Sequence, residues 1–558
     1  MSRTVRWQVL LIGAGMALVA TLLTYLALTY RTEQVPAVGG TYTEGVAGEP
    51  HAINPLLAAY NDVDQDLCAL IFAGLTRFDG SGRVVPDLAQ GWETSLDGLI
   101  YVFHLRSGVR WHDGEPFTAD DVLFTVQLLQ DPDYPGPADI GALWRTVQVE
   151  KVDNYTLRFI LSEPYAPFLD YTTVAILPEH ILAGTRAADL PTLDFNLAPV
   201  GVGPFRIGEV VAERGQISSV LLDRNPAYYG PGPLIEHLRL RFYPSNQSAF
   251  RAYLAGEVDG VAQIALEDID RAYEETGENL QLYSAQMARY SLIFLNLGRP
   301  EDLPFFQEKE VRQALLYGLD REGMVENILH GQAIVAHSPI VAGTWAYDPD
   351  IRRYNYHPEQ ARAMLDRAGW RMPPAALARN KEGIPFTFDL LTSNDSLQVA
   401  LAEEIARQWG ELGVRVTVVT ASPLEVYDAL DQRNYEAALV NLALPGDPDP
   451  YPFWHQTQIT IGQNYAGFDH REMSEVIEAA RITLDMNQRA MLYRRFQEIF
   501  ADEVPALLLY HPVYTYGVDR KVNGVQIGPL MTPADRFATV NLWYVTTRRV
   551  IVSQSQGP

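Results

Sequence analysis

Residues 386–420 contain a strand, a helix and a second strand in direct succession, and this order constrains the fold more than any other feature of the sequence. Residues 386–391 have the composition of a strand, and apolar residues recur at helical spacing through residues 396–412 until Gly413 ends the helix. The second strand, residues 414–420, is rich in valine and threonine. Two strands joined through a helix lie parallel in one sheet, so the sequence predicts an α/β fold.

Residues 84–125 predict a second local unit, and they contain no group suited to catalysis. Apolar side chains alternate through residues 99–106, and a turn then leads to a short strand around Trp111, so a β-hairpin is expected. Thr118 and Asp121 have the spacing of a helix N-cap and its capping acid, and an apolar helix follows them.

The same stretch carries an ordered set of motifs. Pro-Asp-Leu-Ala, a tryptophan, Asp-Gly-Leu, a strand ending in Leu-Arg, Trp-His-Asp-Gly and Thr-Ala-Asp-Asp-Val follow one another. In this order they resemble the signature of the family 5 extracellular solute-binding proteins, the peptide- and oligopeptide-binding proteins of ABC importers. Further blocks resemble the same family: residues 71–78, 200–205, 225–229, 311–314, 320–321, 356–361 and 368–370.

The resemblance implies a bilobal periplasmic-binding-protein fold, class II-like, with mixed sheets flanked by helices and one extra inserted subdomain. Lobe I would be discontinuous and would consist of residues 40–76, 199–288 and 512–547. The inserted subdomain would span residues 77–198 and lobe II residues 289–511, which leaves residues 548–558 as a tail. The crossings between the lobes would form a hinge.

Composition excludes several classes of partner. Acidic residues outnumber basic ones by 69 to 43, a formal net charge of -26, whereas nucleic-acid binding requires a basic surface. A chain of 558 residues can form at least two lobes, and we expect a monomer. The single cysteine, Cys68, permits neither an intramolecular disulfide nor a cysteine zinc cluster.

The N-terminus predicts a membrane segment. Arg3 and Arg6 precede an uncharged run over residues 7–30, which exceeds the roughly 7 to 15 apolar residues of a signal peptide and matches the roughly 20 that span a bilayer. We expect residues 1–31 to be an uncleaved transmembrane helix that holds the protein at the extracytoplasmic face of the membrane, with residues 32–39 as a linker. A long cleaved signal, which would leave the protein periplasmic or secreted, is the alternative.

No enzyme motif is present. The sequence lacks a Gly-x-Ser-x-Gly elbow, a His-Glu-x-x-His helix, a Walker loop and a Gly-x-Gly-x-x-Gly fingerprint, so we predict no catalytic residue, no metal site and no cofactor. Residues 62–66 have the spacing of a calcium loop at its start, but the required Gly and the final Glu are absent. His112-Asp113 could suggest a general base, although its place in a turn favours a structural role.

Residues 434–454 are the predicted ligand site. A strand over residues 435–444 leads into a turn rich in proline and aspartate and then to an aromatic pair. In the resembled family, the backbone of this strand pairs with the bound peptide, which gives affinity without side-chain specificity. The alternative is an internal strand followed by a proline-stiffened loop. The ligand contacts that the resemblance implies here are Val440, Asn441, Leu442 and Trp454.

Leu444 departs from the peptide-binding pattern. Family members that bind di- and oligopeptides have an aspartate here, which pairs with the α-ammonium of the peptide. An ammonium buried without a counter-charge costs several kcal/mol, so this route of recognition is lost. Asp447 or Glu49 could replace the missing charge. The family also includes receptors for oligosaccharides, opines and nickel chelates, which keeps the substrate open.

Other candidate ligand contacts come from lobe I and the inserted subdomain. Aromatic rings supply flat apolar surface with few rotamers to freeze, which favours Tyr134 and Tyr514, and Asn246 is a polar candidate. Each of these rings could equally belong to the core.

These observations predict an extracytoplasmic receptor that captures a peptide or related small solute between two closing lobes and delivers it to an ABC permease. The first alternative is the same fold with another solute in the cleft. A sensor or chaperone role and a hydrolase that retains this shell are the others; the last would need an acid/base pair that the sequence does not reveal.

Overall fold

The computed structural model describes residues 3–213, 215–444 and 446–553. Pro445 of the predicted turn, residues 1–2 of the predicted membrane segment and residues 554–558 of the predicted tail lie outside this range. The described residues include one mixed sheet of twelve strands. Ten of them follow the order β19 (Arg415–Ala421), β18 (Thr387–Ser393), β20 (Ala437–Ala443), β14 (Arg289–Leu295), β21 (Ala506–Asp519), β12 (Gly260–Val261), β2 (Thr41–Ala47), β11 (His237–Tyr243), β10 (Gln216–Arg224) and β9 (Phe205–Glu213).

Strand β21 runs through the middle of this sheet and changes partners halfway along. Its first half pairs with β14 and with β15 (Ala333–Val335), as far as Pro512. From Val513 onward it pairs with β13 (Leu280–Gln286) and then with β12. Since β13 leads directly into β14, the chain crosses between the two halves of the sheet at two neighbouring places, residues 286–289 and 512–513.

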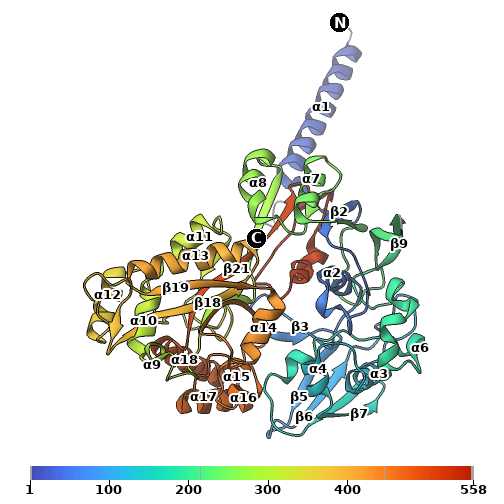
Figure 1. Cartoon of the computed structure of the whole chain (residues 1–558). Helices are drawn as coiled ribbons and strands as arrows, with labels where there is room; N and C mark the ends of the chain where they lie inside the picture. Colours follow the sequence, from blue (N-terminus) through green and yellow to red (C-terminus); the bar gives the residue numbers. More distant parts are fainter. Residues whose placement is uncertain (1–2, 214, 445, 554–558) are drawn as a thin grey trace.

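The half of the sheet around β2 has two apolar cores. The larger contains side chains from α2 (Asp62–Ile71) and from the 3₁₀ helix η5 (Pro533–Leu542). The smaller is built from α7 (Asn246–Leu254), α8 (Ile269–Thr276), β12 and β13, and the two helices lie apart from α2 in Figure 1.

The other half of the sheet is covered on both faces, because alternate residues of β20 enter two different cores. One core contains α10 (Lys309–Tyr317), α12 (Pro358–Arg367) and α13 (Ser396–Glu411), and the other α14 (Pro423–Asp431), α15 (Tyr451–Trp454), α17 (Arg471–Ile482) and α18 (Met486–Glu503). Strands β18 and β19 pair in parallel on either side of α13 in the sequence, so the predicted strand–helix–strand unit is confirmed.

A separate four-stranded antiparallel sheet, drawn in blue and teal in Figure 1, consists of β5 (Ala89–Thr94), β6 (Ile100–Leu105), β8 (Thr156–Leu161) and β7 (Val147–Asp153). The predicted hairpin is wrong. β6 pairs with β5 and β8, and the only pairing near Trp111 is an isolated bridge between Arg110 and Pro116. The capping box of α3 (Ala119–Gln130) is confirmed, since Asp121 accepts the Thr118 N–H at 2.9 Å.

The larger core of the first half encloses a buried charge network. Arg536 of η5 bonds to Glu44 of β2 at 2.6 Å and to Asp66 of α2 at 2.5 Å, and all three side chains are almost completely buried. The hydroxyls of Tyr42 and Tyr516 donate to the second oxygen of Glu44, at 2.8 and 2.5 Å. The network therefore joins β2, α2, β21 and η5, which lie far apart in the sequence.

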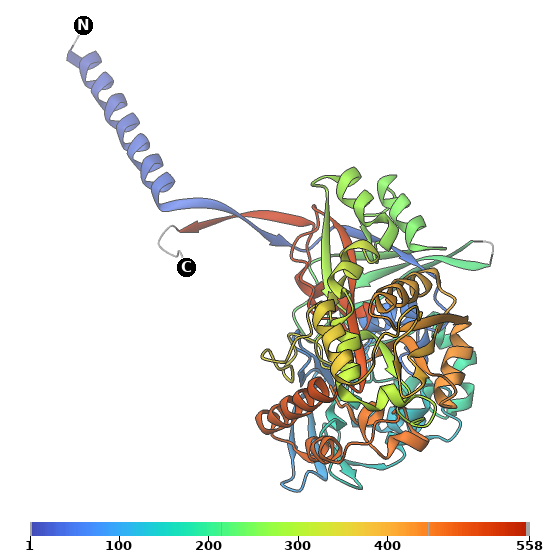
Figure 2. The same cartoon turned by 60° about the vertical axis from the view of Figure 1, so that its left-hand side comes forward.

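Two strands near the ends of the described chain pair outside these cores. Helix α1 (Arg3–Thr29) stands away from the rest of the molecule, and β1 (Tyr30–Ala37) pairs with β22 (Thr546–Ser553) in a two-stranded ribbon between them (Figure 2). Within the described residues, no helix has both the length and the apolar character that crossing a membrane requires. The transmembrane part of the predicted fold is therefore unsupported.

His112 provides a test of this fold through pH. Gly201 donates its N–H to His112 Nδ1 at 3.2 Å, and His112 Nε2 donates to Gly203 O at 3.1 Å. The neutral ring therefore holds the turn at residues 201–203. Burial lowers the pKa of His112 from 6.5 to about 4. The unfolded chain therefore binds a proton there at a higher pH than the folded chain, and we expect the free energy of unfolding to fall as the pH drops from about 6.5 to about 4.

This expectation can be measured by urea unfolding at several pH values. The variant His112→Asn should show a shallower pH dependence over this interval, while His104→Asn, at an exposed ring, should keep the slope of the parent. Equal slopes in the parent and in His112→Asn would contradict the assignment.

Candidate functional site

The last residues of β20 have one backbone edge that pairs with no strand. β20 pairs with β14 along its whole length, but β18 pairs only with residues 437–439. The Leu444 N–H bonds to Ala288 O at 2.9 Å, so the even-numbered residues of β20 direct their backbone groups toward β14 and the odd-numbered ones away from it. The N–H and C=O groups of Asn441 and Ala443 therefore point outward beyond the end of β18.

The side chains around this edge follow the same alternation. Val440 and Leu442 are buried in the core below β20, whereas Asn441 is exposed. Ser291 of β14 is buried and lies directly opposite Asn441 of β20 and opposite Tyr510 of β21. Ser291 Oγ is buried and has no hydrogen-bond partner among the described residues. The edge thus offers backbone groups together with an unsatisfied hydroxyl.

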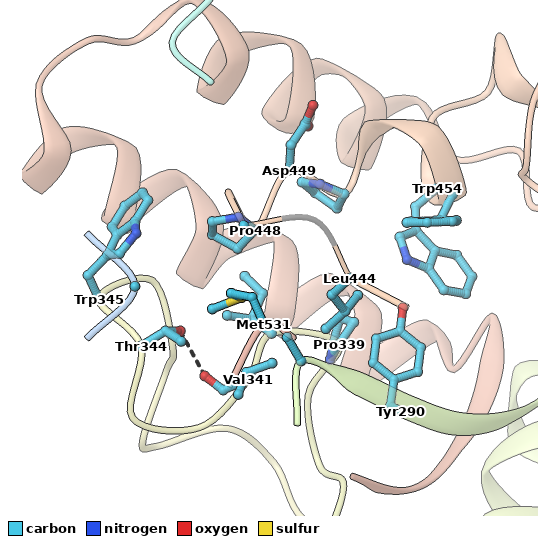
Figure 3. Close-up of a pocket in the computed structure, with 16 residues that line it drawn as sticks. Tyr290, Pro339, Val341, Thr344, Trp345, Leu444, Pro448, Asp449, Trp454 and Met531 are labelled. Carbon is cyan, nitrogen blue, oxygen red and sulfur yellow. Dashed lines mark hydrogen bonds between the residues drawn. The ribbon is translucent and has the colours of Figure 1, made fainter. Parts of the chain in front are cut away.

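A small pocket lies beside this edge (Figure 3). Its volume is about 30 Å³. Its lining residues are Gly82, Ala288, Tyr290, Pro339, Ile340, Val341, Thr344, Trp345, Leu444, Gly446, Pro448, Asp449, Pro450, Phe453, Trp454 and Met531. This volume holds about one water molecule. A larger solute can enter here only if the lining segments separate.

The pocket contains one polar atom without a partner. The hydroxyl of Tyr290 points toward Leu444 in Figure 3, is buried, and has no hydrogen-bond partner among the described residues. Burial raises the pKa of Tyr290 above its ordinary value of 10, so the group stays a neutral donor. Two of the predicted ligand contacts, Leu444 and Trp454, line this same pocket.

Asp447 carries a negative charge that is already neutralised. Its carboxylate accepts two bonds from Arg489, at 2.5 and 2.6 Å, and one from Tyr493 at 3.2 Å, and both members of the ion pair are buried. Burial raises the pKa of Asp447, while the charge of Arg489 opposes this. The ion pair argues against Asp447 as the counter-charge of a ligand ammonium.

The region that includes the four-stranded sheet contacts the loop after β20. Ala166 donates its N–H to Arg481 O at 2.7 Å, and the Arg481 guanidinium lies over the rings of Tyr165 and Tyr451, at 5.1 and 3.9 Å. Asp170 approaches the same loop, and burial together with the charge of Asp447 raises its pKa to about 8. The two regions are therefore in contact in this conformation.

The other predicted contacts lie apart from this pocket. Glu49 follows β2, and its carbonyl accepts the side-chain amide of Asn61 at 3.1 Å. Tyr134 donates to Leu56 O at 3.2 Å, and Asn246 donates to Gln263 at 3.3 Å. Tyr514 is buried in the larger core around α2, where burial raises its pKa. The roles of all ten residues as ligand contacts stay predictions.

Several residues at the pocket had no signal in the sequence. Tyr290, Trp345 and Met531 come from three separate segments, and each stands in a stretch that reads as an ordinary strand or loop. Only a map of which segments meet in space could have identified them. Among the described residues, no group of three His, Cys, Asp or Glu side chains is placed to hold a metal ion.

The Asp447–Arg489 pair can be tested by unfolding. The variant Arg489→Met leaves Asp447 buried without its counter-charge, and we expect the free energy of unfolding to fall by about 3–5 kcal/mol. Arg495→Met, on the same helix but in exposed ion pairs, should cost at most about 1 kcal/mol. The double variant Asp447→Asn/Arg489→Met should be more stable than Arg489→Met alone. Urea unfolding followed by tryptophan fluorescence measures all three, and equal effects at the two arginines would refute the assignment.

Comparison with known proteins identifies the family of this chain. Residues 83–463, more than half of the chain, match the profile described as bacterial extracellular solute-binding proteins, family 5 Middle. The oligopeptide-binding protein AppA of Bacillus subtilis is 28% identical over 503 residues, which cover 88% of this chain and 90% of AppA.

Solved structures agree with this match. The structure of Bacillus subtilis AppA in complex with a nonapeptide aligns with a TM-score of 0.68 at 27% identity and covers 92% of this chain and 100% of that one. The structure of NikZ from Campylobacter jejuni in complex with Ni(L-His) aligns with a TM-score of 0.69 at 26% identity and covers 90% and 99%. The mixed α/β fold of this chain is therefore that of the resembled proteins.

Proposed function

Because the chain belongs to the bacterial extracellular solute-binding proteins of family 5, we propose that it is the substrate-binding receptor of an ABC importer, with a peptide as its solute. It would capture the peptide between two lobes and deliver it to the permease. In this proposal the chain has no catalytic role and acts as a monomer.

The free edge of β20 is the observation that carries the choice of a peptide. A ligand with an extended backbone can pair there with the outward N–H and C=O groups of Asn441 and Ala443, because β18 reaches only Leu439. The relatives bear on the same choice: AppA was solved with a nonapeptide. NikZ was solved with Ni(L-His), so a metal chelate is the second candidate, followed by an oligosaccharide or an opine.

The N-terminal ammonium of the peptide would not be recognised here by pairing with a carboxylate. Leu444 lines the small pocket, and the nearest acid in the sequence beyond it, Asp447, is bound to Arg489. A hydrogen-bond donor, the Tyr290 hydroxyl, is instead free at this place. We therefore propose that the pocket receives a neutral or hydrogen-bond-accepting group, with Glu49 as the remaining candidate counter-charge.

We propose that the lobes follow the division implied by the resemblance. Lobe I would comprise residues 40–76, 199–288 and 512–547, the subdomain residues 77–198, and lobe II residues 289–511. The change of partners along β21 at residues 512–513 and the passage from β13 to β14 support these limits. Closure would bring Gly82 and Met531 against Leu444 and Trp454, which line the same pocket.

The peptide proposal predicts a backbone effect at the edge of β20. Ala443→Pro removes one outward N–H without removing a bond to β14, so we expect the fold to persist and peptide affinity to fall about tenfold or more. Asn441→Ala changes only an exposed side chain and should alter affinity much less. Isothermal titration with tetra-alanine, and with any solute that native mass spectrometry recovers from the purified protein, measures both.

Two results would count against the proposal. Recovery of a sugar or a metal chelate in native mass spectrometry would replace the peptide. A larger loss of affinity in Asn441→Ala than in Ala443→Pro would show that a side chain, and not the strand edge, holds the ligand.

Attachment to the membrane through residues 1–31 stays a prediction of the sequence. Its support is the uncharged run, in which the described side chains of Leu11, Ile12 and Leu18 are exposed along α1. N-terminal sequencing of the native protein tests it. We expect a start at or next to Met1, and a mature start near Pro36 would establish cleavage instead.

A further inference from the structure

A second, much larger cavity lies outside the small pocket. Its volume is about 790 Å³, which falls in the range of small-molecule sites. Its lining comes from α2, β3 (Thr76–Phe78), β4 (Val84–Pro86), the 228–231 loop and η5. Met531 lines both cavities, so the two adjoin each other.

Two guanidinium groups face this cavity. Arg106 donates from Nε to Asp87 O at 2.5 Å, and its guanidinium carbon lies 6.0 Å from the centre of the Tyr229 ring. The backbone of Arg77 pairs with Val85, but its exposed guanidinium makes no hydrogen bond or ion pair within the described residues. The cavity therefore has one guanidinium without a hydrogen-bond partner among the described residues and a second that donates from Nε to a backbone carbonyl.

The acids in the lining leave part of this positive charge uncompensated. Burial raises the pKa of Asp87, while the charges of Arg77 and Arg106 oppose this, and Tyr229 donates to its carboxylate at 2.6 Å. The other acid, Asp535, turns its carboxylate to the N–H groups of Met531 and Thr532, both at 2.8 Å. Two cations thus share Asp87, and a second anion can bind beside Arg77 without displacing an existing pair.

Most of the remaining lining side chains are apolar or aromatic, and Thr76, Thr173, Thr532 and Asn541 are the polar exceptions. Such a surface favours a ligand with an apolar body and disfavours a small, fully hydrated ion such as free phosphate. The side chains concerned are Phe72, Phe78, Pro86, Met531, Phe537 and Val540.

We propose that this cavity is a binding site for an organic anion, a carboxylate with an apolar body, and that Arg77 is the residue that pairs with its charge. The anion has two possible sources: the far end of a solute bound across both cavities, or a separate small molecule. The first source rests on the proposed function, and the second does not.

The test uses the full chain and two matched probes, 4-phenylbutyrate and its neutral amide, 4-phenylbutyramide. Isothermal titration should show that the carboxylate binds at least tenfold more tightly than the amide, and more weakly as salt is raised. Arg77→Gln should remove this preference. Arg494→Gln, an exposed arginine on α18 that lines neither cavity, should keep it.

A second variant tests the place of binding. Ala538 is exposed and lines the cavity, so Ala538→Trp should fill the space and weaken both probes without disturbing the core. Equal affinity of the two probes for the parent, or an unchanged preference in Arg77→Gln, would overturn the proposal.

Ala443→Pro separates the two sources of the anion. If 4-phenylbutyrate binds this variant as it binds the parent while tetra-alanine binding is lost, the cavity is a separate anion site. The second probe is a peptide joined to 4-phenylbutyrate through the phenyl ring, so that the carboxylate stays free. If this peptide binds the parent more tightly than either part alone, and loses that gain in Arg77→Gln, the anion belongs to the transported solute. Failure of the peptide proposal alone would leave the carboxylate preference of the cavity in place.

Discussion

Strand β21 is the constraint on which the arrangement of the two halves depends. Its fourteen residues belong to one continuous strand, yet the first half is fixed to β14 and β15 and the second half to β13 and β12. Separation of the halves therefore has to bend β21 and the short link between β13 and β14 together. Pro512 stands where the partners change and has no N–H to give to a ladder. Two adjacent crossings restrict the motion to bending about one line, as a hinge between lobes requires.

Buried charges fix the parts on each side of these crossings. Arg536 reaches Glu44 and Asp66 across a core whose contributing segments begin at Tyr42 and end at Trp543. Asp447 and Arg489 do the same below β20. A buried ion pair adds little net stability, but it is costly to break, because the remaining charge is left without a partner. Such pairs therefore favour one arrangement of distant segments over others.

Local signals in the sequence predicted local structure, and distant pairings escaped them. The strand–helix–strand unit around α13 and the capping box at Thr118 depend on neighbouring residues and are confirmed. The hairpin prediction failed because alternation identifies a strand but not its partner: β8, about fifty residues further on, occupies the edge that was assigned to the segment of Trp111.

The residues of the candidate site show the same difference between local and distant signals. β20 and the lining residues Leu444 and Trp454 came from one motif, whereas Tyr290 and Met531 reach the pocket only through the fold. Asp447 looked like a free acid because its partner, Arg489, stands 42 residues away.

The edge of β20 is not entirely vacant, and this bears on how a ligand would bind. Tyr427 of α14 donates its hydroxyl to Asn441 O at 3.4 Å, a long bond from a side chain that is about half exposed. A peptide that pairs with Asn441 has to replace this bond with its own N–H, which is a near-equal exchange, whereas the N–H of Ala443 has no such competitor in the described structure. Backbone pairing at two residues distinguishes few ligands, since every peptide offers the same groups. Selectivity then has to arise from the surfaces on either side of the edge, and these differ in kind: a narrow apolar pocket with one free hydroxyl, and a wide cavity with a free guanidinium.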